Sequence, residues 1–288
     1  MVAVKKSSPT RVGVVFSSGF FGFFAHAGFL EGIRELGLRP VAYAGASSGA
    51  IVGAMAASDM EDKRIKEILF GLKKEDFWDP DPWPRIVVAC LRLFRGYTGY
   101  LKGERFYRLL GRQLRVRSFE QCAWPLAIVA TNLSLMREEV FTQGDLLHAV
   151  AASGAVPGFF RPVRYRGCLF VDGGVVNKAP VLALCRLTEL DKVIVHFMDS
   201  GSFSEPRELF LRRWLTPWHI HIHAVDIARK ESYRWQCELA TASGVEVVEV
   251  RTRPPSLGPN SLDQGPEAFY KAKADTVHIL SSHLNPSR

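Results

Sequence analysis

The first 58 residues alternate between short apolar runs and helical patterns, with glycine-containing turns between them. Residues 11–16 (RVGVVF) and 40–46 (PVAYAGA) are the apolar runs, which are typical of buried strands. Residues 23–36 place apolar side chains at helical spacing, and residues 48–58 form a helix pattern rich in small residues. This β-α-β-α opening predicts a three-layer α/β/α fold with a mostly parallel central sheet.

The same alternation continues along the chain. Further buried strands are expected at 124–133, 168–174, 192–199 and 245–250, and helices at 104–115, 144–152, 224–242 and 267–283. The aromatic and proline-rich run FWDPDPWPR is predicted to contain no regular element. Because the strands are spread evenly, we expect one domain over residues 1–288. Its parts would be a core at about 11–200, a cap-like aromatic and basic insertion at about 76–118, and a C-terminal extension at 201–288.

Composition and charge indicate which partners and which cellular compartment suit this protein. The formal net charge of +8 favours acidic partners such as anionic lipid or nucleic acid. No signal-peptide pattern opens the chain, and no run of about 18 uncharged apolar residues predicts a membrane-spanning helix. We therefore expect a cytoplasmic protein that meets a membrane only at its surface. The cysteines are scattered without a CxxC pair and are expected to be reduced thiols: Cys90, Cys122, Cys168, Cys185 and Cys237.

The run Gly45-Ala46-Ser47-Ser48-Gly49 ends the second apolar strand and opens a helix. A nucleophile elbow requires this strand–turn–helix setting, because the serine must stand exposed on a sharp turn. Gly45 and Gly49 would allow the close approach of helix and strand. Ser47 would then stand at the helix N-terminus, whose free N–H groups stabilise the oxyanion that develops when the serine attacks a carbonyl. The alternative is a small-residue turn that only lets the helix pack closely.

The turn at residues 17–22 (SSGFFG) has two interpretations. A dinucleotide-binding fingerprint would need a glycine at position 17, where Ser17 stands. It would also need an acidic residue near the end of the next strand, which ends in Ala-Gly-Ala-Ser instead. The other interpretation is an oxyanion loop, in which the main-chain N–H groups of Ser18, Gly19 and Phe20 face Ser47. Two parallel strands would bring this turn and the elbow to one edge of the sheet.

A serine nucleophile needs a base, which is most often a histidine. Eight histidines are present, and His196 or the group His219, His221 and His223 would satisfy the chain order of an α/β-hydrolase. That fold lays down several strands before the elbow, however, and here only residues 11–16 precede the elbow strand. The run from Val171 to Asn177 (VDGGVVN) offers Asp172 as another base at a strand end, held by the turn residues Gly173 and Gly174. Burial would raise the pKa of that aspartate and improve it as a base.

Four segments, in order, resemble the blocks of the patatin-like phospholipase family. They are Ser17–Gly22 with its helix, the Gly45–Gly49 elbow, residues 152–163 (ASGAVPGFFRPV) and residues 170–181 (FVDGGVVNKAPV). The resemblance implies a Ser47–Asp172 dyad without a catalytic histidine, metal or cofactor, and hydrolysis of lipid acyl esters through an acyl-enzyme. It also implies that the loop around Gly19 is the oxyanion hole.

The first block departs from the family pattern in two places. The family usually has a glycine where Ser17 stands and a lysine or arginine where Phe21 stands. These departures bear on the preference for phospholipid rather than on ester hydrolysis, so the expected activity is that of a phospholipase A-type enzyme or of a carboxylesterase. Three alternatives stay open: an α/β-hydrolase-like esterase with a downstream histidine, a catalytically weak lipid-binding module, and an acyltransferase on the same fold.

Two other patterns have less specific interpretations. His219, His221 and His223 alternate with isoleucines, so on a strand they would share one face and could bind a metal, although a packed or surface cluster is the simpler expectation. The stretch 85–117 is rich in arginine and aromatic residues, with Glu104 as its only acidic residue. It could dock on anionic lipid, form a lid over an acyl groove, or be a solvated basic face. No RNA-binding signature accompanies it, so nucleic acid is not expected as a partner.

Overall fold

The computed structural model describes residues 10–198, 217–255 and 257–284. Within these residues, eight strands form one sheet in the order β10-β9-β1-β2-β4-β8-β7, with β5 also paired to β4. The parallel strands are β1 (Val12–Phe16), β2 (Ala42–Ala46), β4 (Leu126–Asn132), β9 (Lys192–Met198) and β10 (Glu246–Thr252). The antiparallel strands are β5 (Arg137–Phe141), β7 (Val163–Tyr165) and β8 (Cys168–Val171). The predicted α/β fold with a mostly parallel sheet is confirmed.

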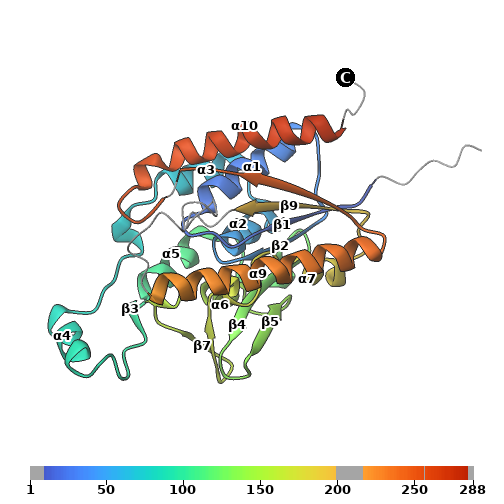
Figure 1. Cartoon of the computed structure of the whole chain (residues 1–288). Helices are drawn as coiled ribbons and strands as arrows, with labels where there is room; N and C mark the ends of the chain where they lie inside the picture. The colour runs from blue at the N-terminus through green and yellow to red at the C-terminus, as the bar shows by residue number, and fades with distance from the viewer. Residues whose placement is uncertain (1–9, 199–216, 256, 285–288) are drawn as a thin grey trace, which may run out of the picture.

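Helices cover both faces of the sheet (Figure 1). One face carries α1 (Phe23–Glu35), α2 (Ser48–Ala57), α3 (Asp62–Phe70), α5 (Glu104–Gln113), α6 (Leu146–Ser153) and α10 (Gly265–Leu284). The other carries α7 (Val181–Leu187) and α9 (Pro217–Ala242). A two-stranded ribbon of β3 (Gly99–Leu101) and β6 (Gly158–Phe160) lies outside the main sheet. Short 3-10 turns occupy Lys74–Asp76, Phe119–Gln121, Gly173–Val175 and Leu262–Gln264.

The alternation of side chains along the strands explains the two covered faces. In β1, Val14 and Phe16 pack into the core beneath α1 and α2, whereas Val15 packs into the core beneath α7 and α9. Successive side chains of a strand point to opposite faces, so a strand that is apolar at every position must be buried on both. The continuous apolar runs in the sequence therefore required helices on both sides of the sheet.

The structure corrects two local expectations. The run FWDPDPWPR was expected to lack regular structure, but α4 (Trp83–Leu91) begins inside it. Pro84 is compatible with this helix because the N–H groups of the first turn have no carbonyl acceptor within the helix, so a residue without an N–H loses no hydrogen bond there. Helix α9 begins at Pro217 rather than near residue 224, so the alternating histidines lie on a helix and do not share one strand face.

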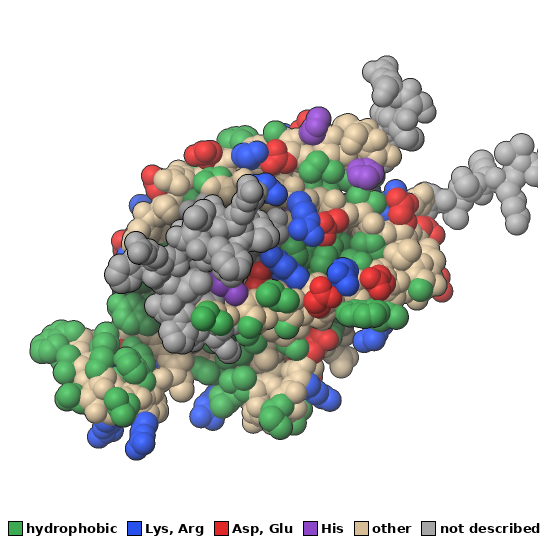
Figure 2. Space-filling view, in the orientation of Figure 1, with side chains coloured by type: hydrophobic (Ala, Val, Ile, Leu, Met, Phe, Trp, Pro, Cys, Tyr) green, Lys and Arg blue, Asp and Glu red, His purple; other side chains and the backbone are tan. Residues whose placement is uncertain are grey.

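The α4 helix stands apart from the two layers of helices, at the lower left of Figure 1. Exposed apolar side chains gather over it in the space-filling view of Figure 2. None of the helices in the described part of the chain is both long enough and apolar enough to cross a membrane.

Helices α1 and α10 approach each other closely at Gly28. A Cβ atom added there would lie 2.0 Å from the main-chain oxygen of Phe269, and a helix carbonyl cannot turn aside as a side chain can. Gly53 in α2 is different, because an added Cβ would meet the side chain of Leu126 at 3.5 Å, an ordinary contact.

We expect Gly28→Ala to destabilise the fold by about 3 kcal/mol, since overpacking against a backbone forces whole helices to shift. The matched variant Gly53→Ala is expected to be neutral or to stabilise by up to about 1 kcal/mol, because alanine favours a helix interior. Urea unfolding of both variants measures the difference. Equal stability of the two would contradict the close contact between α1 and α10.

Candidate active site

Ser47 stands at a sharp turn between β2 and α2. Its φ of 57° lies in the left-handed region, which a non-glycine residue adopts at a cost of about 1 kcal/mol or more. A Cβ on Gly45 would meet the oxygen of Gly49 at 2.4 Å, and a Cβ on Gly49 would meet the oxygen of Phe16 at 2.4 Å. Both glycines are therefore required by the close approach of strand and helix.

Hydrogen bonds fix the serine in this turn and direct its hydroxyl. The Ser47 N–H donates to Ser153 Oγ at 2.8 Å, and that hydroxyl donates to the Val129 carbonyl of β4 at 2.6 Å. Ser47 Oγ donates to Asp172 Oδ2 at 2.5 Å. Ser153 lies in the segment 152–163 that the sequence singled out, but its role follows only from this geometry.

Asp172 is held between β8 and the 3-10 turn that follows it. Its carbonyl accepts a hydrogen bond from Thr131 Oγ1 at 2.8 Å, and its Oδ1 accepts the Gly174 N–H at 2.7 Å. A Cβ on Gly173 would lie 2.0 Å from the Val129 oxygen, so only glycine fits against β4 at that position. The Oδ2 atom is thereby left facing Ser47.

The environment of Asp172 suits a base that works near neutral pH. Burial raises the pKa of Asp172 to about 6, while the hydrogen bonds from Ser47 and Gly174 and the charge of Arg229 act in the opposite direction. A carboxylate with such a pKa is ionised at neutral pH and accepts a proton more readily than an ordinary aspartate.

Arg229 supports the aspartate turn from helix α9. Its Nη1 donates to the Gly174 carbonyl at 2.7 Å, and its Nη2 donates to Asp226 Oδ1 at 2.8 Å. The Asp226 carboxylate also pairs with the buried Lys178 at 3.3 Å. The sequence alone does not point to Arg229 as part of the site. The three-residue spacing of Asp226 and Arg229 on a helix indicates only a local ion pair.

The loop at residues 17–22 lies beside the elbow, as the parallel pairing of β1 and β2 requires. Ser17 Oγ accepts the Met198 N–H at 2.9 Å and so ties the loop to the end of β9. The Ser18 N–H donates to the Lys178 carbonyl at 2.7 Å, which removes Ser18 from the predicted oxyanion donors. Among the described residues, the N–H groups of Gly19 and Phe20 have no carbonyl acceptor, and both residues line the same pocket as Ser47.

The histidines proposed as alternative bases are placed differently. His196 is buried, with Nδ1 at 2.7 Å from Nδ1 of His26 and Nε2 at 2.8 Å from Thr252 Oγ1, so both of its ring nitrogens are engaged away from Ser47. Burial lowers the pKa of His26 to about 3 and lowers that of His196, so both rings are neutral. The side chains of His219 and His221 lie outside the described residues. In the described part of the chain, no group of three potential ligands could hold a metal ion.

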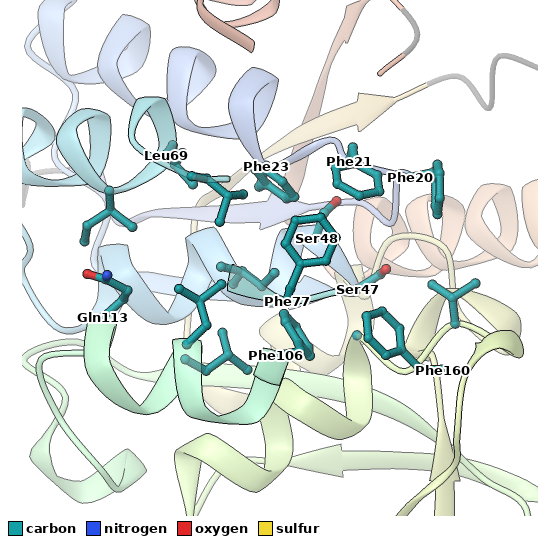
Figure 3. A pocket seen from close by; sticks show the side chains of 18 of the residues that line it. Phe20, Phe21, Phe23, Ser47, Ser48, Leu69, Phe77, Phe106, Gln113 and Phe160 are labelled. Atoms are coloured by element: carbon teal, nitrogen blue, oxygen red, sulfur yellow. The ribbon is translucent and has the colours of Figure 1, made fainter. Parts of the chain in front are cut away.

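An apolar pocket opens beside Ser47 (Figure 3). It contains about 840 Å³ of empty space, including its open mouth. Gln113 lies at one end of it and Ser47 lies toward the other, near Phe20 and Phe160 (Figure 3). The Ser48 Oγ in its wall has no hydrogen-bond partner among the described residues. Seven phenylalanines supply much of the lining: Phe20, Phe21, Phe23, Phe77, Phe106, Phe159 and Phe160.

Fold and site together define a class of protein. A three-layer α/β/α fold presents a serine on a strained strand-to-helix turn, a buried carboxylate accepts a hydrogen bond from the serine hydroxyl, and an apolar pocket adjoins the pair. The sequence model of the patatin-like phospholipase family matches residues 14–185, more than half of the chain. The chain therefore belongs to the patatin-like phospholipase family.

Individual relatives agree with this assignment. An uncharacterised NTE family protein of Mycobacterium tuberculosis is 30% identical over 178 residues, which cover 62% of this chain and 46% of the relative. The lysophospholipase NTE1 of Cryptococcus neoformans is 26% identical over 200 residues, covering 69% of this chain and 12% of that protein. The chain thus matches less than half the length of these curated relatives. The crystal structure of VipD from Legionella pneumophila has a similar fold, with a TM-score of 0.53, 13% identity, and coverage of 96% of this chain and 68% of that one.

The raised pKa of Asp172 has a consequence for stability. Ionising this buried carboxyl costs the folded protein about 1.4 kcal/mol for each pH unit by which folding raises its pKa. The neutral isostere in Asp172→Asn avoids this cost and keeps an oxygen to accept the Gly174 N–H.

We therefore expect Asp172→Asn to stabilise the fold at about pH 8 by on the order of 3 kcal/mol, with the pKa raised from 3.8 to about 6. The gain should shrink as the pH falls through about 6, where the folded protein takes up the proton, and be small at about pH 4. Thermal or urea unfolding of both proteins across this range measures it. A gain that does not depend on pH would contradict the raised pKa.

Proposed function

We propose that this protein hydrolyses the acyl ester bonds of lipids through Ser47 and Asp172. The observation that carries the proposal is the 2.5 Å hydrogen bond from Ser47 Oγ, in the wall of a pocket lined with phenylalanine, to a buried carboxylate. A pocket of this lining fits an acyl chain, and Ser47 stands where the ester carbonyl at the end of that chain would lie. The family membership and the lysophospholipase name of one relative support a lipid substrate.

The reaction begins as the Ser47 hydroxyl proton passes to Asp172 Oδ2 and Oγ bonds to the ester carbonyl carbon. The carbonyl oxygen becomes an oxyanion, which the N–H groups of Gly19 and Phe20 and the N-terminus of α2 stabilise. The ester C–O bond then breaks, and the leaving alcohol takes the proton from Asp172. An acyl group remains on Ser47 Oγ, with its chain in the pocket.

Water completes the cycle. Asp172 accepts a proton from a water molecule as that water attacks the acyl carbon of the acyl-enzyme. The second tetrahedral intermediate collapses, the C–O bond to Ser47 breaks, and the proton on Asp172 returns to Oγ. The products are a carboxylic acid and the free enzyme.

The pocket wall bears on which part of the substrate is recognised. Phe21 lines the pocket at the position where the family pattern usually has a cation, and its ring packs on Phe77 at 5.7 Å between ring centres. This position therefore contributes apolar contact and no charge to a phosphate. We assign selectivity at the site to the acyl chain, which suits a carboxylesterase as well as a phospholipase A-type enzyme.

Ser47→Ala and Asp172→Asn are each expected to lower hydrolysis of a nitrophenyl acyl ester by at least about a thousandfold, since members of a nucleophile–base pair act as a unit. A fluorophosphonate probe should label Ser47, and peptide mapping locates the label. Ser58→Ala is the matched control, because Ser58 is a buried serine at the other end of α2. It should keep both turnover and labelling.

Labelling at another serine, or full turnover in Asp172→Asn, would contradict the dyad. A downstream-histidine esterase makes the reverse prediction. In that case a glutamine at one of His196, His219, His221 and His223 would abolish turnover, and Asp172→Asn would be tolerated.

Arg229 provides an independent test of Asp172 as the base. We expect kcat/KM of the wild-type protein to rise with pH through about 6, as Asp172 loses its proton. Because the Arg229 charge lowers the pKa of Asp172, Arg229→Met should move this rise to higher pH, and Arg229→Lys should keep it nearer its original place.

Arg234→Met is the control, since Arg234 is an exposed arginine on the same helix, paired with Glu231 at 3.2 Å. It should leave the pH profile unchanged. A uniform loss of activity in Arg229→Met, without a shift of the profile, would limit Arg229 to a structural role.

A further inference from the structure

The segment 82–98, called the α4 finger below, comprises α4 and the turn that follows it. Its only buried helical residue is Ala89. Trp83 is 75% exposed, Leu91 80% and Leu93 79%, and Figure 2 shows the resulting apolar patch at the lower left of the molecule. A contiguous exposed patch of large apolar side chains indicates an interaction surface, because water penalises it in a free protein.

The charge of the α4 finger has one sign. The segment contains Arg85, Arg92 and Arg95 and no aspartate or glutamate. All three arginines are exposed, and Figure 2 shows basic side chains along the border of the patch. Two copies of this chain meeting through this surface would bring like charges together, which opposes self-association.

Ion pairing joins the root of the α4 finger to the wall of the pocket. The fully buried Asp81 carboxylate pairs with Arg161 Nη2 at 2.5 Å and with Arg85 Nη1 at 3.6 Å. Arg161 directly follows Phe160, which lines the pocket. The first turn of α4 is therefore fixed to the strand that supplies a pocket phenylalanine.

A second set of contacts holds the two ends of the segment together. Asp79 accepts hydrogen bonds from the N–H groups of Gly103 at 3.1 Å and Arg105 at 3.0 Å, at the start of α5. The ring of Trp78 packs on pocket residue Phe159 at 5.7 Å between centres. Whatever binds the α4 finger is therefore held close to the pocket beside Ser47.

We infer that the α4 finger docks on the surface of an anionic lipid bilayer, with its tryptophan, leucine and phenylalanine side chains in the interface and its arginines on the headgroups. An apolar face bordered by cations fits this partner, since apolar burial and attraction to anionic lipid act together. The inference rests on the proposed function and deepens it, because it names a bilayer as the source from which the acyl chain enters the pocket.

Vesicle sedimentation tests the docking with the full chain. The wild-type protein should bind vesicles of mixed phosphatidylcholine and phosphatidylglycerol more tightly than vesicles of phosphatidylcholine alone, and salt should weaken the difference. The double variant Leu91→Asp with Leu93→Asp should bind the mixed vesicles at least about tenfold more weakly. Arg92→Gln with Arg95→Gln should lose mainly the preference for anionic lipid.

Leu239→Asp is the matched control, because Leu239 is a 53% exposed leucine on α9, away from the α4 finger. It should bind vesicles as the wild type does. None of the described pocket-lining residues belongs to the α4 finger, so the aspartate variants should hydrolyse a soluble nitrophenyl ester within about twofold of the wild-type rate.

Cys90 allows a second measurement that needs no apolar substitution. It is exposed on α4, whereas the other four cysteines are partly buried. An environment-sensitive dye on Cys90 should shift to shorter wavelength with anionic vesicles and be quenched by brominated lipid. This result supports the docking even if the aspartate variants fail to fold.

The experiments distinguish failure of the docking from failure of the proposed function. If the dye does not respond to vesicles in a protein that hydrolyses the soluble ester, the docking is overturned and the proposed function stands. If the protein binds vesicles but does not hydrolyse the ester, the proposed function is overturned and the docking stands. Sedimentation of the lipid-free wild type as a dimer, and of the aspartate variant as a monomer, would instead assign the α4 finger to self-association.

Discussion

The hydrogen bond between Ser47 Oγ and Asp172 Oδ2 joins segments 125 residues apart, and the central sheet sets the distance between them. Ser47 follows β2, Asp172 follows β8, and β4 lies between these strands. The carbonyl of Val129 in β4 accepts from the serine that fixes the elbow and also lies against Gly173. One strand thus positions both halves of the pair, so a shift of β4 would separate the hydroxyl from its acceptor.

This arrangement costs stability in two ways. Ser47 adopts a left-handed backbone conformation, and Asp172 holds a charge that burial disfavours at neutral pH. The surroundings must outweigh both costs. The strand and helix pack closely at Gly45 and Gly49, which stabilises the turn that holds Ser47. Hydrogen bonds from Thr131 and Gly174 stabilise the turn that holds Asp172. The strain is therefore located where the chemistry requires an accessible hydroxyl and a poised carboxylate.

Local sequence carried most of the information on the elbow and the aspartate turn. A glycine required by a close contact, such as Gly49, can be recognised in the sequence alone. The same holds for the apolar runs of strands that are buried on both faces. Contacts between distant segments leave no such pattern. Arg229 looks like any helical surface arginine until α9 is placed against Gly174, and the engagement of the Ser18 N–H depends on a carbonyl 160 positions away in the chain.

The unpredicted helix α4 and the early start of α9 both involve a proline. Pro84 and Pro217 each lie in the first turn of a helix, where the missing N–H would have had no intrahelical acceptor, so neither proline interrupts its helix. The alternation of histidine and isoleucine after Pro217 also imitates a strand period. Farther along the same helix, Tyr233 and Ala240 are buried in the core with α7 and the sheet, and helical stability comes mainly from such tertiary packing rather than from a short local pattern.

The two proposals divide recognition between a charged surface and an apolar pocket. Phe21 gives the pocket wall no cation beside Ser47, whereas the α4 finger carries three arginines without an acid among them. Charge attraction would then act when the protein meets a bilayer, before any ester reaches Ser47. Once an acyl chain is in the pocket, apolar contact alone would hold it. Headgroup chemistry should accordingly affect how often the enzyme reaches its substrate, and acyl-chain chemistry should affect how fast it turns over.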